Sequence, residues 1–188
     1  MPKLYYKYGT MNSSKTSNLL MIAHNYTSQG KKVCLIKPQM DSRFSVNQIT
    51  SRAIGSVDAD ILLCPTTDNI CTDSSVSCVL VDEAQFLSEK NVLALRNITE
   101  HTPVMAFGLR TDFMGKLFEG SRALFELADS IEEIKTICEY CERKAIINAK
   151  YTIIGDKQKI IYEGNQIELG SEDIYKPMCW KCWKNARE

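Results

Sequence analysis

The sequence predicts an α/β fold, in which helices cover a mostly parallel sheet and a small lobe follows at the C-terminus. Two observations predict it. Apolar strand-like runs alternate with segments of helical spacing through the first 137 residues. From Cys138 onward the segments are short and alternating, and they end in a turn-rich stretch and a cysteine pair. We therefore expect one domain over residues 1–137 and a second lobe over residues 138–188.

The expected elements follow in chain order. A short aromatic strand over residues 3–8 leads through a small polar turn, residues 9–16, into a helix over residues 17–29. Further elements are strands over 32–37, 60–64, 78–81 and 104–109, helices over 89–98 and 117–127, and alternating segments over 145–151 and 159–162. Turn-rich residues 170–175 follow, and residues 41–56 and 110–116 are expected to be polar connections near the site.

Composition narrows the class of protein. The chain has 188 residues, 44% of them hydrophobic, which is enough to bury a core. Its 23 basic and 23 acidic residues cancel, so no general attraction for nucleic acid or anionic membranes is expected. Apolar runs stay below the roughly 20 residues of a membrane span, and the first eight residues lack the apolar stretch of a secretion signal. We expect a cytoplasmic protein with neither nucleic acid nor membrane as a partner.

The turn after the first strand nearly matches a phosphate-binding loop. It consists of Gly9, Thr10, Met11, Asn12, Ser13, Ser14, Lys15 and Thr16. The pattern Gly, four residues, Gly, Lys, Ser or Thr fails only at Ser14. In such loops backbone N–H groups and the N-terminus of the next helix hold polyphosphate. We expect Lys15 to contact the β and γ phosphates and Thr16 to bind a magnesium ion. The alternative is a serine-rich turn in which Ser13 or Ser14 caps the helix.

Two acidic residues follow an apolar strand. Val79, Leu80 and Val81 lead into Asp82 and Glu83, at the strand end where parallel sheets place ligands. Asp82 is expected to hold the magnesium ion of a nucleotide, directly or through water. Glu83 is the candidate general base that takes a proton from a sugar hydroxyl attacking the γ-phosphate. The alternative is a pair of acids in the first turn of the next helix.

The eight cysteines divide into two groups. Cys34, Cys64, Cys71 and Cys78 are scattered through apolar segments and are expected to be buried thiols. The pairs Cys138 and Cys141, then Cys179 and Cys182, supply four thiolates, which predicts a closed structural zinc site. The alternatives are a redox pair or unconnected thiols. Zinc would tie the start of the second lobe to its end.

Taken in order, these motifs resemble the zinc-containing (type II) thymidine kinases over nearly the whole chain. The resemblance includes residues 3–8 leading into 10–15, the stretch ValLeuValAspGluAlaGlnPheLeu at 79–87, GlyLeuArgThrAspPhe at 108–113, and LysThrIleCys at 135–138. It implies a RecA-like nucleotide domain with a zinc-binding lasso over the nucleoside. The implied reaction transfers the γ-phosphate of ATP to the 5′-hydroxyl of thymidine, giving dTMP and ADP, with dTTP as feedback inhibitor and a homotetramer as assembly.

The resemblance also implies roles for individual residues. ATP would lie on Gly9 to Thr16, with Asp41, Arg43 and Gln85 also in the nucleotide site. Magnesium would lie near Thr16 and Asp82, with Glu83 as the base. The thymine pocket would be lined by Met11, Phe86, Leu109, Phe113 and Phe118, with Asn148 nearby. Tyr175 would face the acceptor, and the backbone of Gly170, Ser171 and Glu172 would bond the base edge. Without the resemblance, Phe86 and Phe118 read as packing residues.

Three positions depart from the family pattern: Ser14 replaces a glycine, Asn148 replaces a common threonine, and Trp180 replaces a common arginine. We expect Ser14 to affect ATP binding or turnover and Asn148 to affect base selectivity. Trp180 is expected to affect only a surface or lobe contact. Two alternative functions remain. One is a RecA-like nucleic-acid ATPase with a zinc module for strands, which the neutral charge disfavours. The other is a catalytically silent nucleoside-binding relative, suggested by Ser14.

Overall fold

The computed structural model describes residues 1–39, 47–155, 157–166 and 174–187. Its centre is a six-stranded sheet in the order β5-β2-β6-β7-β1-β8, and every neighbouring pair is parallel. The strands are β1 (Leu4–Gly9), β2 (Lys32–Pro38), β5 (Ile61–Leu63), β6 (Val76–Val81), β7 (Val104–Leu109) and β8 (Ser130–Glu133). Because all six run the same way, their carboxyl ends meet at one edge, the ligand edge of parallel sheets.

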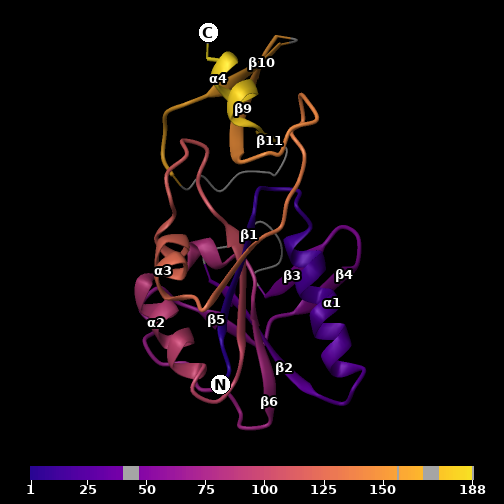
Figure 1. Ribbon diagram of the computed structural model, residues 1–188, viewed down its shortest axis with the longest axis vertical. Coiled ribbons are helices and arrows are strands. Elements are labelled where there is room, and N and C mark those ends of the chain that lie inside the picture. The colour runs from indigo at the N-terminus through magenta and orange to yellow at the C-terminus, as the bar shows by residue number, and fades with distance from the viewer. Residues whose placement is uncertain (40–46, 156, 167–173, 188) are drawn as a thin grey trace.

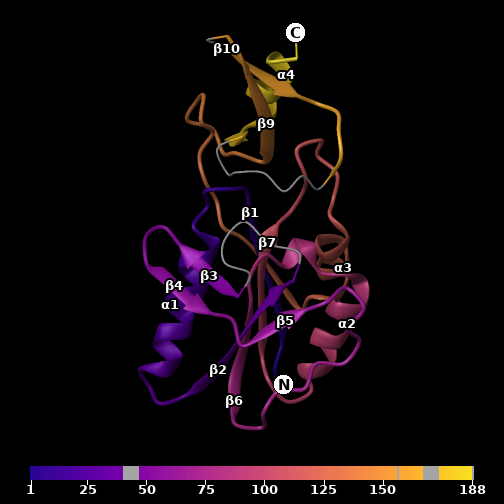
Figure 2. The same ribbon diagram turned by 180° about the vertical axis from the view of Figure 1, so that it is seen from behind.

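Helices cover both faces of this sheet (Figure 1, and from behind Figure 2). On one face, α1 (Lys15–Thr27) packs Leu19 and Leu20 against Leu80 and Phe107. A hairpin of β3 (Gln48–Ser51) and β4 (Gly55–Asp58) joins the same layer. The other face carries η1 (Ala84–Phe86), α2 (Glu89–Ile98) and α3 (Glu119–Leu127). Burial on both faces explains why the central strands are almost continuously apolar.

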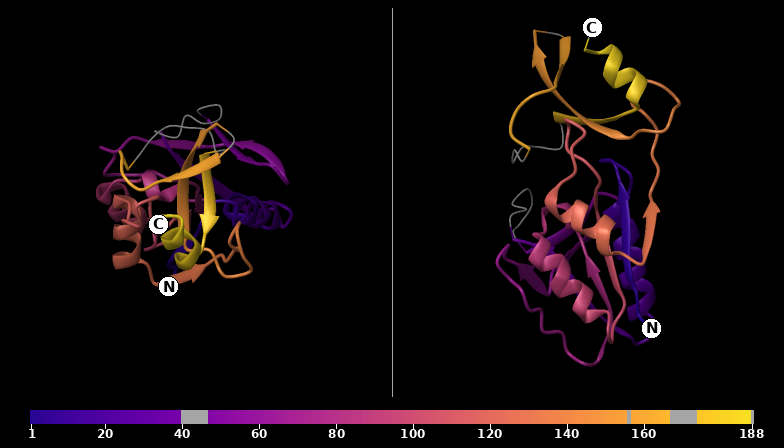
Figure 3. Two further views of the ribbon diagram at one scale, coloured as in Figure 1. Left: turned by 90° about the horizontal axis from the view of Figure 1, so that it is seen from above. Right: turned by 60° about the vertical axis from the view of Figure 1, so that its left-hand side comes forward.

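The C-terminal part forms a second layer of structure with its own small core. A three-stranded antiparallel sheet has the order β10-β9-β11, from β9 (Ile147–Ile154), β10 (Lys157–Ile161) and β11 (Tyr175–Met178), and α4 (Trp180–Asn185) follows. Its core contains Ile147, Ala149, Ile160, Met178, Trp183 and two of the paired cysteines. This part stands beyond the ligand edge of the large sheet (Figure 3). The proposed division at residues 137 and 138 stays a prediction.

The predicted α/β fold with a mostly parallel sheet is confirmed, and the bounds of α2 and β7 agree with those expected. Other expectations were wrong. The described part of the expected connection 41–56, residues 47–56, contains β3 and the start of β4, and the strands β8 and β11 and the helix α4 were missed. Cys64 and Cys71 are exposed, whereas Cys34 and Cys78 are buried as expected. Within the described ranges, every helix is too short or too polar to pass through a membrane.

Candidate active site

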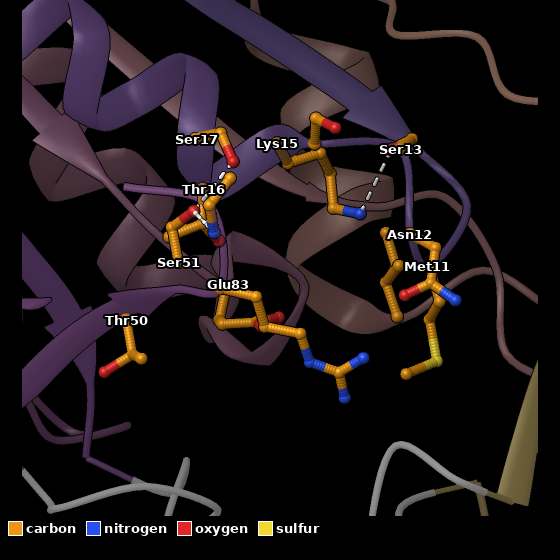
Figure 4. A pocket seen from close by; sticks show the side chains of 13 residues that line it. Met11, Asn12, Ser13, Lys15, Thr16, Ser17, Thr50, Ser51 and Glu83 are labelled. Atoms are coloured by element: carbon orange, nitrogen blue, oxygen red, sulfur yellow. Dashed lines mark hydrogen bonds between the residues drawn. The ribbon is translucent and has the colours of Figure 1, made fainter. Parts of the chain in front are cut away.

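A cavity of about 260 Å³ opens at the ligand edge, between the loop after β1 and the ends of β6 and β7. Figure 4 shows the labelled loop side chains and Glu83 around the same space. The cavity is lined by Met11, Asn12, Ser13, Ser14, Lys15, Thr16, Ser17, Thr50, Ser51, Arg52, Ala53, Glu83 and Leu109. The structure therefore brings together the loop, one of the two predicted acids, and two of the predicted base-pocket residues, Met11 and Leu109.

The backbone of the loop is shaped to present its N–H groups. Asn12 and Ser14 have φ of 59° and 61°, the left-handed region, and α1 begins directly after Ser14. Within the described part of the chain, the Ser14 side chain makes no cap hydrogen bond, so the helix-capping alternative lacks its defining contact. Lys15 Nζ donates to Thr10 O at 2.7 Å and to Ser13 Oγ at 3.4 Å, folding the cation over the loop. These features suit an anion at the start of α1.

Ser14→Gly is expected to raise the free energy of unfolding by about 0.5–1 kcal/mol, because a residue with a Cβ is strained at φ 61°. Chemical denaturation measures the change. Ser14→Ala is the matched control, since it removes the hydroxyl but keeps the Cβ and should give no gain. Equal stability of the two variants would contradict the strain argument. A gain of several orders of magnitude in turnover for Ser14→Gly would instead favour the silent-relative alternative.

Thr16, which lines the cavity, contacts Asp82. Thr16 Oγ1 donates to both carboxylate oxygens of Asp82, at 3.2 and 3.1 Å, across 66 residues of sequence. Asp82 is only 5% exposed. Burial, followed by the neighbouring charge of Glu83, raises the pKa of the Asp82 carboxyl to about 7. A divalent cation would reverse this penalty, so a buried carboxylate beside a hydroxyl fits the oxygen ligands that magnesium prefers.

Glu83 and Gln85 form a second contact behind the cavity. Glu83 has φ of 50°, the left-handed region, immediately before η1. Its Oε2 accepts from Gln85 Nε2 at 2.5 Å. Gln85 is expected in the nucleotide site, but it is not among the described residues that line the cavity. The predicted nucleotide contact of Gln85 stays a prediction.

Asn148 connects the second lobe to the phosphate loop. It lies on β9, is 3% exposed, and accepts a hydrogen bond from Met11 N at 2.7 Å through Oδ1. Its Nδ2 donates to Thr111 O at 3.0 Å. One amide therefore joins three segments: the loop after β1, the segment after β7 and the start of the lobe. Asn148 therefore lies beside Met11, which is predicted to line the base pocket. A contact between Asn148 and the base stays a prediction.

The other predicted base-pocket residues lie in the same region of the fold. The rings of Phe86 and Phe118 meet edge to face with centroids 5.9 Å apart. Phe113 is buried beneath Lys150 Nζ, 5.2 Å from its ring centroid. Tyr175 lies on β11 in register with Lys150 of β9. The predicted site residues Asp41, Arg43, Gly170, Ser171 and Glu172 fall outside the described residues.

The four paired cysteines converge in the second lobe. The sulfur atoms of Cys138, Cys141, Cys179 and Cys182 all lie within 4.8 Å of one another. Cys141 Sγ is 3.6 Å from both Cys179 Sγ and Cys182 Sγ. Tetrahedral zinc with bonds of about 2.3 Å separates its sulfur ligands by about 3.8 Å. The cluster could therefore hold a zinc ion in a closed site with no position for substrate.

Comparison with known proteins decides the family. A family model described as thymidine kinase matches residues 2–183. The chain belongs to the thymidine kinase family. Thymidine kinases of Streptococcus agalactiae serotype Ia and Streptococcus pyogenes serotype M3 are each 44% identical to it, over 98% of both chains. The resemblance expected from the motifs is confirmed.

Within this thymidine kinase family member, the structure adds site residues that the sequence analysis missed. The β3–β4 hairpin supplies Thr50 and Ser51 from β3, and Arg52 and Ala53 from its turn, to the cavity. Ser51 Oγ contacts Ser17 Oγ at 2.8 Å. Gln166 Nε2 donates to Asp112 Oδ2 at 2.9 Å. In sequence, Gln166 precedes residues 170–172, which are expected to bond the base edge. The run Thr50, Ser51, Arg52 places two hydroxyl groups beside an arginine, which is a weak sequence signal for a phosphate site.

Proposed function

We propose that the protein is an ATP-dependent thymidine kinase, which transfers the γ-phosphate of ATP to the 5′-hydroxyl of thymidine and yields dTMP and ADP. The observation that carries this proposal is the match to the family over 98% of the chain at 44% identity. The cavity supports it, because a phosphate loop and an acidic side chain border the same space. Phosphoryl transfer needs both features, one to hold the triphosphate and one to accept a proton.

The nucleotide end of the reaction belongs to the loop and to Asp82. Backbone N–H groups of residues 12–15 hold the phosphates, since Met11 N already donates to Asn148, and Lys15 exchanges its contact with Thr10 O for a phosphate oxygen. Thr16 and Asp82 would hold magnesium, which would neutralise negative charge on the phosphates. Asp41 and Arg43, which lie outside the described residues, complete the proposed nucleotide contacts.

The acceptor end belongs to Glu83. The thymidine 5′-oxygen forms a bond to the γ-phosphorus as the bond from phosphorus to the ADP oxygen breaks. The hydroxyl proton passes to a carboxylate oxygen of Glu83, the general base. Glu83 suits this role because it lines the cavity that the phosphate loop also lines. Asp82, which contacts Thr16 from a buried position, stays with the metal.

The base pocket completes the proposal. Met11, Leu109 and the phenylalanines at 86, 113 and 118 pack the thymine ring, while Asn148 and Tyr175 border it. Backbone groups of residues 170–172 pair with the base edge and reject bases that leave them unpaired. Zinc bound by the four cysteines would stabilise the lobe that carries Asn148 and Tyr175. Inhibition by dTTP, a homotetramer and a cytoplasmic location stay predictions from the sequence.

A kinase panel tests the proposal. The purified protein is incubated with ATP, magnesium and each natural nucleoside, and the products are separated. We expect dTMP and ADP in equal amounts from thymidine, and no comparable product from purine nucleosides. ATP hydrolysis that DNA stimulates, with no nucleoside phosphorylated, would overturn the proposal in favour of the nucleic-acid ATPase.

A further inference from the structure

The side chain of Gln85 is buried between the proposed base and the central sheet. It lies in the middle of η1 and is 1% exposed. Nε2 donates to Glu83 Oε2 at 2.5 Å, and Oε1 accepts from Leu109 N at 2.9 Å. A carboxylate only accepts and a backbone N–H only donates, so the orientation of this amide is fixed by its two partners. Gln85 thus links Glu83 to the end of β7.

The Leu109 end of this link is held firmly. Its carbonyl accepts from the hydroxyl groups of Tyr6 at 2.8 Å and Ser121 at 2.6 Å, and both bonds are buried. Tyr6 lies on β1, which precedes Leu109 in the chain, and Ser121 lies on α3, which follows it. Hydrogen bonds away from water are strong and costly to break. Leu109 is therefore a rigid anchor for the glutamine.

Glycine 108 makes room for the arrangement. A Cβ at this position would lie 2.9 Å from both Gln85 N and Gln85 Oε1, closer than side-chain atoms approach. A Cβ at Gly120 would lie 2.4 Å from Ala84 O and 2.7 Å from Leu87 O. β7 and α3 thus both approach η1 at a glycine. The segment that carries Gln85 is confined on two sides.

We propose that Gln85 is a positioning residue that holds the Glu83 carboxylate in the orientation needed to accept the proton of the nucleoside hydroxyl. The inference rests on the proposed function, which it deepens by assigning how the base is oriented. Glu83 sits on a strained backbone, and a partly buried glutamate can adopt several rotamers. The bond to Oε2 selects one of them. Misplacing a reacting group by about 1 Å costs up to 10² in rate.

Two variants separate positioning from support of the fold. Gln85→Glu keeps an oxygen for Leu109 N but sets a second carboxyl against Glu83, and two carboxyls this close share one proton, so Glu83 is no longer ready to accept another. Gln85→Met keeps the length and removes both bonds. We expect each to lower kcat for thymidine about tenfold or more, with KM values within about twofold of wild type. Wild-type kcat in a folded Gln85→Met variant, which loses the bond to Glu83 without adding a charge, would overturn the proposal.

A double-mutant cycle tests whether Gln85 acts through Glu83. In the Glu83→Gln background, Gln85→Met is expected to cause no further loss of kcat, because the group it positions is gone. An equal loss in both backgrounds would overturn the positioning role. Thermal unfolding of each variant identifies any that fails to fold, and the cycle then runs with Gln85→Glu. Failure of the proposed function is seen separately, as a wild-type protein that makes no dTMP.

Discussion

Glu83→Gln is expected to lower kcat for thymidine by about 10² or more while leaving the binding of ATP and thymidine intact. The amide has nearly the shape of the carboxylate and can still contact Gln85, but it cannot take the hydroxyl proton. The loss therefore falls on the chemical step. Steady-state kinetics give kcat, and calorimetric titration of each substrate gives the dissociation constants. The fold should be unaffected, because Glu83 lies at the edge of the cavity and outside the core clusters.

Glu89→Gln is the matched control. Glu89 is an exposed acid near the start of α2, and its ion pair with Arg122 at 3.4 Å lies in solvent. Exposed pairs contribute less than about 1 kcal/mol, so this variant should retain wild-type turnover. Wild-type turnover in Glu83→Gln would remove Glu83 from the role of base. Loss of ATP binding in the same variant would show that Glu83 serves the nucleotide rather than the proton.

The parts of the fold that were predicted are those with strong local signals. Val104–Leu109 is a continuous apolar run, and Glu89–Ile98 follows the capping residue Ser88 and carries a helical apolar period. The hairpin was missed because Gly55–Asp58 is exposed at every position, and in β3 Ile49 is the only apolar residue that is buried. β8 was missed for a similar reason, since Ser130–Glu133 is a polar edge strand. Their pairing is set by tertiary contact, which no local period reveals.

The site divides in the same way. The phosphate loop and the acids after β6 were predicted because each is a contiguous motif at the end of an apolar strand. The bond from Asn148 to Met11 spans 137 residues, and that of Gln85 to Leu109 spans 24. Nothing local distinguishes these amides from ordinary polar residues. Their roles follow only from the way the lobe and β7 are placed against the loop.

Removal of zinc is expected to unfold the second lobe. Its core is small and includes the sulfur cluster itself, with Cys138 and Cys179 among its buried residues. A lobe of this size has too little apolar area to stay folded alone, and structural zinc contributes on the order of 10 kcal/mol in small domains. Chelation, or Cys179→Ser, should therefore abolish hydrogen-exchange protection along β9. Elemental analysis of the untreated protein should give about one zinc per chain.

The large sheet should survive this treatment, because its two core clusters contain none of the four cysteines. ATP binding should nevertheless weaken, since unfolding β9 withdraws the Asn148 oxygen that holds Met11 N. Cys71→Ser is the control, because Cys71 is exposed and lies far from the cluster in sequence. It should retain zinc, protection of β9 and ATP affinity. Protein purified under reducing conditions that contains no zinc, yet keeps β9 protected, would show that the thiols hold the lobe by packing alone.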